Sequence, residues 1–399
     1  MGGFSNWLSQ LGAVTKLSMQ TILERKGSST SAAFGIAGVV FVLVFVLSIG
    51  RGFKRTLTVG GSPDAAIVLR SGSDSEMMSG LGREDVRVVS DTPGIARSAN
   101  GALASGELFV IISLPKRSTG TDANVPFRGV ESAAFDVRRD LRIIEGRRFE
   151  AGKNEIIAGA AAARQFARLD LGNKFRIGPD EWTVVGIFSA KGGITESEIW
   201  TDAGVLQPAY RRGDSFQSVH LKLSSADEFG KVKGRLTTDP RLNVKVVRES
   251  EYYAEQSEGM SNLIMFLGVP VALMMGVGAA FGALNTMYTA VAARTREIAT
   301  LRALGFGRSP VVISVLIESA CLAFIGGAFG GAMAYFAFDG YRTATLNWQT
   351  FSQVAFAFDV TPTLLALGIV YAALIGLVGG LFPAIRAARL PIATALRGL

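Results

Sequence analysis

The sequence has little of what most catalytic and metal sites are built from. Its 399 residues include a single cysteine, Cys321, and a single histidine, His220. This excludes an internal disulfide, a multi-cysteine zinc site and a His–His metal pair. The phosphate-loop motif G-x-x-x-x-G-K-[ST], the G-x-S-x-G elbow and H-E-x-x-H are all missing from the sequence. We therefore expect no catalytic residue, no metal ligand and no cofactor bound by this chain.

The acidic residues and the polar loops add no sign of catalysis. Glu196 and Glu198, like Asp136 and Asp140, have the spacing of ordinary surface groups, and we predict that they are exposed. Two loops rich in glycine, serine and threonine, 116–126 and 191–198, are either partner contacts or plain connectors.

Charge is scarce, and the apolar residues form long runs. Only 19% of the residues are charged, 49% are hydrophobic, and the mean hydropathy is +0.33. A membrane-spanning helix needs about 20 apolar residues. Four runs meet this need: 32–49, 263–293, 311–338 and 364–384. Burial of four such runs inside one soluble protein is the alternative, and we consider it improbable.

The net charge of +8 is explained by where the basic residues lie. Residues 51–260 carry nearly balanced charges, and most remaining lysines and arginines lie before residue 27, within 294–308, or after residue 385. Arg342 is an exception. By the positive-inside rule, both termini and the 294–310 segment are cytoplasmic, and 51–260 and 339–361 lie outside. This distribution argues against a nucleic-acid partner.

We predict an α-helical integral membrane protein with four transmembrane helices and a large α+β extracytoplasmic domain inserted between the first and second. The domain should consist of two subdomains, with 130–210 as the outer, strand-rich one. Its strand–helix–strand unit before the second span should pack beside the strands that follow the first. The predicted segments are an amphipathic N-terminal helix 1–30, spans 31–50, 261–293, 311–338 and 362–385, the domain 51–260, a cytoplasmic segment 294–310, a short external loop 339–361, and a cytoplasmic tail 386–399.

The N-terminal segment should lie along the inner leaflet with Lys16, Arg25 and Lys26 toward the lipid headgroups. The alternative is a disordered leader.

Two features inside the spans suggest helix contacts rather than a polar pathway. Glycines recur at four-residue spacing, which allows helix backbones to approach closely, within or between subunits. They are Gly278 and Gly282, Gly326 and Gly330, Gly327 and Gly331, and Gly376 and Gly380. Glu318 is the only ionisable residue within the four predicted spans. It marks either a functional helix contact or a group near the interface beside Arg308 or water.

Several motifs together resemble the permease subunits of MacB/FtsX/LolC-type ABC transporters, the mechanotransmission class. "REIATLRALGF" (296–306), followed by "ESACLAFIGGAFG" (318–330), is similar to the family's signature. The tail "GGLFPAIRAARLPIATALRGL" is similar to the family's ending, and contributes Pro383, Arg386, Arg389, Pro391, Leu396 and Arg397. "EGRRF" (145–149) and "WTVVGIF" (182–188) resemble parts of its outer domain.

The resemblance implies a multi-pass protein of the bacterial inner membrane that works as a dimer, either a homodimer or a pair with a sister permease. ATP and Mg²⁺ would be bound by a separate cytoplasmic ABC ATPase, whose hydrolysis moves the outer domain to export a periplasmic substrate or to extract a lipid or lipoprotein. A periplasmic adaptor is a possible further partner. The alternative within the family is an FtsX-like regulator of a peptidoglycan hydrolase. A membrane-anchored sensor or adhesin is the third possibility.

The segment 294–310 should then be the coupling helix that enters a groove on the ATPase. Ile298, Leu301 and Leu304 are its expected apolar contacts, and Arg296 and Arg302 its charged ones, with Glu297 orienting one arginine. Gly305 should end the helix and Pro310 should begin the next element.

Overall fold

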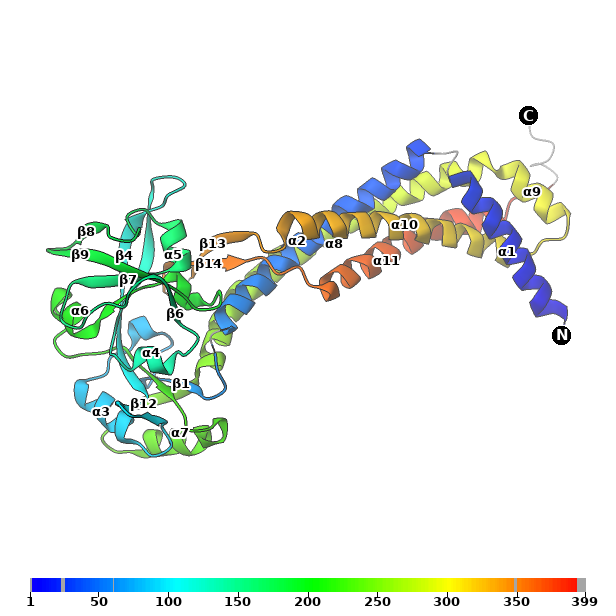
Figure 1. The fold of residues 1–399 in the computed structure, drawn as a ribbon. Helices are drawn as coiled ribbons and strands as arrows, with labels where there is room; N and C mark the ends of the chain where they lie inside the picture. Colours follow the sequence, from blue (N-terminus) through cyan, green and yellow to red (C-terminus); the bar gives the residue numbers. More distant parts are fainter. Residues whose placement is uncertain (1, 23–25, 60, 348–349, 393–399) are drawn as a thin grey trace. The chain divides into compact units, whose positions relative to one another are not determined.

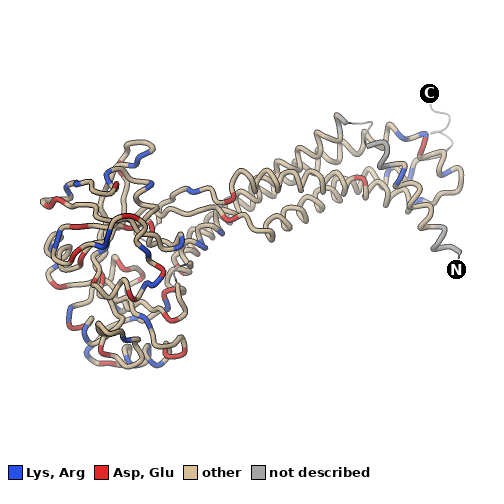
Figure 2. Tube along the Cα trace, in the orientation of Figure 1, with Lys and Arg blue, Asp and Glu red and all other residues tan. Residues whose placement is uncertain are grey.

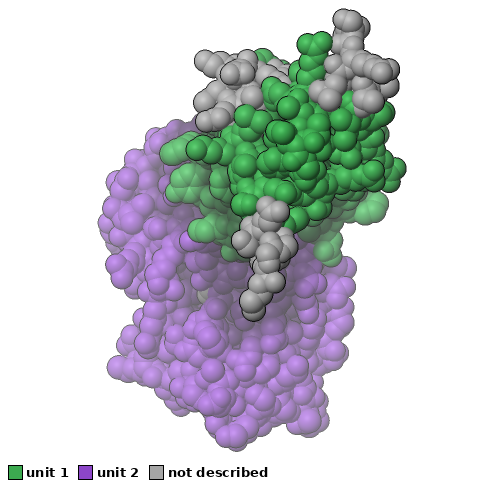
Figure 3. All heavy atoms as spheres, turned by 90° about the vertical axis from the view of Figure 1, so that its right-hand side faces the viewer, with its two compact units in different colours: residues 1–50, 262–341, 358–399 green, residues 51–261, 342–357 purple. Residues whose placement is uncertain are grey.

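The computed structural model describes the 399-residue chain except for residues 1, 23–25, 60, 348–349 and 393–399. The chain divides into two compact units, shown in two colours in Figure 3. Unit 1 contains residues 1–50, 262–341 and 358–399, and unit 2 contains residues 51–261 and 342–357.

Unit 1 is helical in its described residues. Its helices are α1 (Gly2–Ile22), α2 (Lys26–Thr58), α8 (Glu249–Ala293), α9 (Thr295–Ala303), α10 (Arg308–Phe338) and α11 (Pro362–Ala388), and α2 and α8 continue into unit 2 (Figure 1). Four of them, α2, α8, α10 and α11, are long and apolar enough to cross a membrane. Charged residues are rare along their apolar stretches (Figure 2). Both α2 and α8 extend beyond the expected spans 31–50 and 261–293.

Glycines bring α10 close to α2 and α11. A Cβ added at Gly326 would lie 2.5 Å from the carbonyl oxygen of Ala33, and one at Gly330 would lie 2.2 Å from that of Ala37. Either distance is far shorter than a carbon–oxygen contact, so only glycine allows this approach. A second contact, between α10 and α11, includes Gly327 and Gly331 on α10 and Gly376 and Gly380 on α11. A Cβ added at any of these four would lie within 3.4 Å of the neighbouring helix.

Gly278 and Gly282 on α8 differ from these glycines. A Cβ added at either position has no atom within 4 Å among the described residues. This glycine pair is therefore open in the single chain, although its spacing is the same.

Unit 2 is built on one large sheet. Its order is β12-β1-β11-β4-β5-β10-β7-β9-β6, with β8 paired to β9. The strands are β1 (Ala65–Arg70), β4 (Ala104–Pro115), β5 (Asp122–Val130), β6 (Arg142–Gly146), β7 (Glu155–Gly159), β8 (Lys174–Ile177), β9 (Asp180–Ser189), β10 (Ile199–Asp202), β11 (Ser218–Lys222) and β12 (Val244–Arg248), with a separate pair β2 (Arg97–Ser98) and β3 (Gly101–Ala102). Its helices are α3 (Arg83–Asp91), α4 (Ala134–Val137), α5 (Ala160–Gln165), α6 (Ala203–Ala209) and α7 (Phe229–Thr238), with 3₁₀ turns η2 (Glu76–Met78), η3 (Ile194–Ser197) and η4 (Ala226–Glu228).

Strand β1, which follows the first apolar run, lies between β11 and β12, the two strands that precede the second apolar run. Strand β1 pairs antiparallel with β11 through Ile67 and His220, and with β12 through Ile67 and Val247. Helix α7 connects β11 to β12, which makes the strand–helix–strand unit that the sequence predicted beside β1.

Unit 2 has two main hydrophobic clusters on its continuous sheet. One gathers residues from both ends of the insert, including Val68, Phe216 and Val246. The other comes from the middle of the insert and includes Phe127 and Trp182, whose rings meet edge to face. The long strands β4 and β5 pair from Glu107 to Pro115, so the sheet is unbroken between the clusters.

The segment 339–361, predicted as a short external loop, contains a hairpin that the sequence did not indicate. Its strands are β13 (Arg342–Asn347) and β14 (Ser352–Ala357), and the hairpin belongs to unit 2. The Asn124 side chain donates to the backbone oxygen of Phe351 at 2.9 Å, and the backbone N–H of Ala355 donates to Ser197 Oγ at 3.0 Å. The alternating burial of β14 indicates a strand packed on one face, which the sequence reading missed.

Candidate functional site

Helix α9, in the segment between α8 and α10, has one face packed against the ends of the long helices. Ile298 and Ala299 are buried. Ile298 lies in an apolar cluster with Val291 of α8, Val315 of α10 and Ala387 of α11. Burial of this face explains why the segment is a short, regular helix rather than a loose loop.

The end of α9 is a defined stop. Gly305 has φ +95°, a conformation that costs glycine little. The N–H of Gly305 donates to the oxygen of Arg302 at 3.1 Å, and the N–H of Phe306 donates to that of Leu301 at 3.1 Å. These two bonds form a Schellman motif, which satisfies carbonyls that the helix would otherwise leave open. Leu304, the residue just before Gly305, is 72% exposed.

Arg294, between α8 and α9, lies in a buried ion-pair cluster. Its Nη1 is 3.2 Å from Glu318 Oε2 on α10, and its Nε is 3.1 Å from Glu297 Oε2 in the first turn of α9. The side chains of Arg294 and Glu318 are 7% and 5% exposed. The cluster therefore connects three helices within unit 1.

The opposite end of α9 contacts α11. Arg302 Nη1 donates to the backbone oxygens of Ala388 at 2.7 Å and Leu390 at 3.1 Å. The Ala388 carbonyl is the last of α11, and the Leu390 carbonyl lies just beyond the helix. A helix has unpaired acceptors and partial negative charge at this end, so a guanidinium is favourable there.

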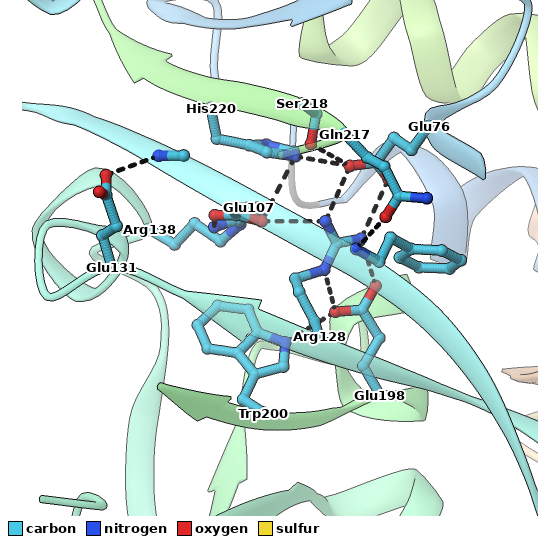
Figure 4. A network of polar contacts seen from close by, with 12 residues as sticks. Glu76, Glu107, Arg128, Glu131, Arg138, Glu198, Trp200, Gln217, Ser218 and His220 are labelled. Carbon is cyan, nitrogen blue, oxygen red and sulfur yellow. Dashed lines mark hydrogen bonds and ion pairs between the residues drawn. The ribbon is translucent and has the colours of Figure 1, made fainter. Parts of the chain in front are cut away.

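A second cluster of charges is buried inside unit 2 and centres on Arg128 of β5 (Figure 4). The guanidinium bonds Glu76 through both terminal nitrogens at 2.8 and 3.0 Å, and Glu198 through Nε and Nη2, each at 2.9 Å. Nη1 also donates to Glu107 at 2.9 Å. All five N–H groups of Arg128 are thus used, in the fork geometry that suits carboxylates.

Neighbouring groups complete this cluster. Arg138 Nη2 donates to Glu107 at 2.9 Å, Trp200 Nε1 donates to Glu198 at 2.7 Å, and His220 Nε2 lies 3.1 Å from Glu76. Ser218 also donates to Glu76, at 2.6 Å.

The cations set the protonation states of the cluster. Burial by itself would raise the pKa of Glu107, but Arg138, His220 and Arg128 outweigh it and lower the pKa to about 2. Burial and Arg138 disfavour a charged His220, yet Glu107, Glu249 and Glu76 raise the pKa of the imidazole above its ordinary value. The pKa of Glu76 is also lowered, by Arg128 and His220 against the effect of burial, so Glu76 and Glu107 are ionised at neutral pH, and the imidazole is held toward its charged form.

Glu76, Glu107 and His220 bring their possible ligand atoms within 4.8 Å of one another, a spacing that suits a metal ion. However, Arg128 donates to both carboxylates, so a guanidinium already provides the positive charge. The residues do not fit a metal site as they stand.

Two family models of known proteins match this chain, one over its N-terminal part and one over its C-terminal part. Residues 29–239 match the MacB-like periplasmic core domain, and residues 270–392 match the FtsX-like permease C-terminal domain. The chain belongs to the MacB/FtsX family of ABC transporter permeases.

Relatives of the permease include one of the same length and others that are longer. An uncharacterized ABC transporter permease, YknZ of Bacillus subtilis, is 23% identical, and the match covers 96% of this chain and 98% of the relative. The macrolide export ATP-binding/permease protein MacB of Bdellovibrio bacteriovorus is 24% identical over 95% of this chain, which spans 60% of that relative. The crystal structure of the extracellular domain of a YknZ transporter from Gram-positive bacteria matches 46% of this chain at 18% identity and a TM-score of 0.35.

The structure places the residues expected to touch an ATPase in different surroundings. Leu304 and Arg296 are exposed, and Leu301 is half-buried. Ile298 is buried against the long helices, which removes it from the outer face. Arg302 is half-buried, and its guanidinium caps α11.

The structure also shows the surroundings of Glu318 and of the tail residues. The partner of Glu318 is Arg294, not Arg308. In the tail, Pro383 is buried, Arg386 lies over the Tyr288 ring at 5.5 Å, Arg389 ends α11, and Pro391 is exposed. Leu396 and Arg397 lie outside the described residues.

The N-terminal helix packs on the permease itself. Val14 of α1 is buried, Trp7 Nε1 donates to Ser309 Oγ at 3.0 Å, and the Gln10 side chain accepts from the N–H of Gly307 at 3.2 Å. The backbone of α1 is helical, as expected, and its described side chains contact the segment that follows α9. Of the three basic residues expected at the headgroups, Lys16 is exposed and Arg25 lies outside the described residues.

The prediction that Glu196 and Glu198 are exposed is wrong. Both are buried: Glu198 bonds Arg128, and Glu196 accepts from Ser189 Oγ at 2.7 Å and from the Gly192 N–H at 2.9 Å. The sequence offered a signal, because Arg128 stands in an apolar strand and Glu198 lies two residues from Trp200 on one strand face. A charge inside such a strand indicates a buried partner.

Proposed function

We propose that this permease couples ATP hydrolysis by a cytoplasmic ABC ATPase to movement of residues 51–261, for export of a periplasmic substrate or extraction of a lipid or lipoprotein. The observation that carries the proposal is α9. It is a short helix, capped at its C-terminus and packed on one face, and it has a large apolar side chain exposed at its end.

The exposed end of α9 is suited to bind a protein groove. Leu304 is 72% exposed on a segment that the positive-inside rule assigns to the cytoplasm. Thr300, Ala303 and Arg296 are also exposed on this helix. An exposed leucine beside an arginine is typical of a small interface centre with a polar rim.

The spans support mechanical coupling rather than passage of a polar substrate between them. Glu318 is the only acidic or basic residue within the predicted spans, and Arg294 pairs with it. An ion-coupled pathway would need acidic or basic groups along the spans. We infer that the work is done by movement of the helices, whose ends are continuous with unit 2 through α2 and α8.

A second permease subunit, identical or a sister chain, would cover α8. This helix has the smallest buried share of the four candidate spans, and its Gly278 and Gly282 have open space in front of them. A small-x-x-x-small step open to the outside is suited to close contact with another helix.

In this proposal the ATPase partner binds ATP and Mg²⁺, both termini of the permease are cytoplasmic, and 51–261 is extracytoplasmic. The match to a MacB-like core domain favours export or extraction over control of a peptidoglycan hydrolase. A periplasmic adaptor is a further candidate partner.

The proposal is tested by binding of the ATP-binding subunit encoded nearest to this chain to the full permease in nanodiscs. Wild type should bind, and Leu304→Asp should weaken binding by about tenfold or more, because a carboxylate would be desolvated in the groove. Ile144→Asp is the matched control: Ile144 is also an exposed apolar residue, but it lies in β6 of unit 2. Equal binding by Leu304→Asp and wild type would refute the assignment of α9 as the docking helix.

A further inference from the structure

Both ends of α9 are attached to neighbouring spans by arginines. At the first end, Arg294 contacts Glu318 of α10 at 3.2 Å and Glu297 of α9 at 3.1 Å. At the second end, Arg302 contacts the last carbonyls of α11 at 2.7 and 3.1 Å. The two residues lie eight positions apart, on opposite sides of the buried Ile298 and Ala299.

The contact at the first end is buried. The side chains of Arg294 and Glu318 are 7% and 5% exposed, so removal of one partner is costly for the other. After loss of Glu318, Arg294 keeps its contact with the more exposed Glu297, but the ion pair that joins Arg294 to α10 is gone. The backbone also changes direction at Arg294, whose φ and ψ of −107° and 15° lie outside the helical region.

The contact at the second end is a cap on another helix. The guanidinium of Arg302 satisfies acceptors at the C-terminus of α11 and lies at the negative end of its dipole. An arginine used in this way on α11 is poorly placed to be the main charged contact with a partner protein.

We propose that Arg294 and Arg302 are positioning residues that fasten α9 to α10 and α11, so that a force on α9 moves both spans together. This inference rests on the proposed function of α9 as the docking helix. It assigns Glu318 to the same device as the counter-charge of Arg294. Without the two arginines, α9 would lose these polar attachments to α10 and α11, and would move more independently of the spans.

The test measures hydrogen exchange of backbone amides in the full permease in nanodiscs, without any ATPase. In Glu318→Gln, the amides of α9 should exchange about tenfold faster or more, equivalent to about 1.4 kcal/mol of local opening. The amides of α10 beyond Gly326 should exchange as in wild type. General loss of stability would instead raise exchange along all of α10.

Two further variants keep the test decisive if Glu318→Gln does not fold. The charge exchange Arg294→Glu with Glu318→Arg, made together with Glu297→Gln so that two carboxylates do not meet, restores opposite charges and should bring α9 exchange back toward wild type. Arg302→Gln removes only the half-buried contact to α11 and should speed exchange at residues 299–303. Arg308→Gln is the control, because Arg308 is an exposed arginine of the same segment. Unchanged exchange of α9 in Glu318→Gln and Arg302→Gln would overturn the proposal, and so would equal acceleration in Arg308→Gln.

The functional part of the test separates this inference from the proposed function. Arg302→Gln should still bind the ATP-binding subunit in nanodiscs, because Leu304 is unaltered, but ATP hydrolysis should become independent of the permease. If wild type fails to bind that subunit, the docking function is wrong, and the exchange data still decide whether the arginines fasten α9. If binding is lost in Arg302→Gln while exchange of α9 is unchanged, Arg302 is a partner contact and the positioning role is refuted.

Discussion

Replacement of Arg128 by methionine should destabilise unit 2 more than the loss of a surface ion pair would. Arg128 is 1% exposed and uses all five N–H groups on Glu76, Glu107 and Glu198. Without it, Glu107 keeps Arg138 and Glu76 keeps His220, but Glu198 is left with the neutral donor Trp200. Breaking a buried pair by removal of one partner costs about 3–5 kcal/mol. For a domain of this size, that lowers the unfolding temperature by about 6–20 °C.

The assay is thermal unfolding of the full chain in detergent, followed by tryptophan fluorescence, because Trp182 and Trp200 are both buried in unit 2. The matched control is Arg147→Met. Arg147 also has a bidentate partner, Glu155, but its side chain is half-exposed and its ion pair is screened by water, so the unfolding temperature should change little. Equal unfolding temperatures for the two variants would refute the view that the Arg128 cluster holds unit 2 together.

Two further predictions concern pH and helix packing. The raised pKa of His220 means that its stabilising contribution is complete below about pH 6.5 and is lost as the pH rises through the higher folded-state pKa. The unfolding temperature of unit 2 should therefore fall above about pH 6.5 in wild type and fall less in His220→Gln; parallel profiles would contradict this. Gly330→Ala would place a Cβ 2.2 Å from the Ala37 oxygen and should cost about 1–3 kcal/mol in a thermal melt, whereas Gly278→Ala meets open space and should change stability little. Replacement of Gly278 and Gly282 by leucine should instead lower the dimer fraction counted by single-molecule photobleaching in nanodiscs; an unchanged dimer fraction would place the dimer contact elsewhere.

The parts of the structure that depend on local pattern could be predicted from the sequence. Long apolar runs indicated the four long helices, and Gly305 was recognised as the end of α9 because a left-handed residue there favours glycine. The placement of β1 beside β11 and β12 followed from the strand–helix–strand pattern at the end of the insert.

The misses all depend on contacts between distant residues. Glu198 is buried beside Arg128, which is 70 residues away in the sequence. Arg302 donates to the backbone at the end of α11, 86 residues further along the chain, a contact that the sequence did not indicate. Spacing within one segment does not reveal which distant backbone group a guanidinium will find. The hairpin β13–β14 was missed for the same reason, since its partners Asn124 and Ser197 come from the insert.

The most direct test of the account is whether ATP changes unit 2 through α9. Hydrogen exchange over residues 51–261 should be compared with and without ATP, using the permease in nanodiscs with the adjacently encoded ATP-binding subunit. ATP should alter exchange in this region in wild type and in Ile144→Asp, and should leave it unchanged in Leu304→Asp. An equal response to ATP in Leu304→Asp, or no response in wild type, would contradict the account.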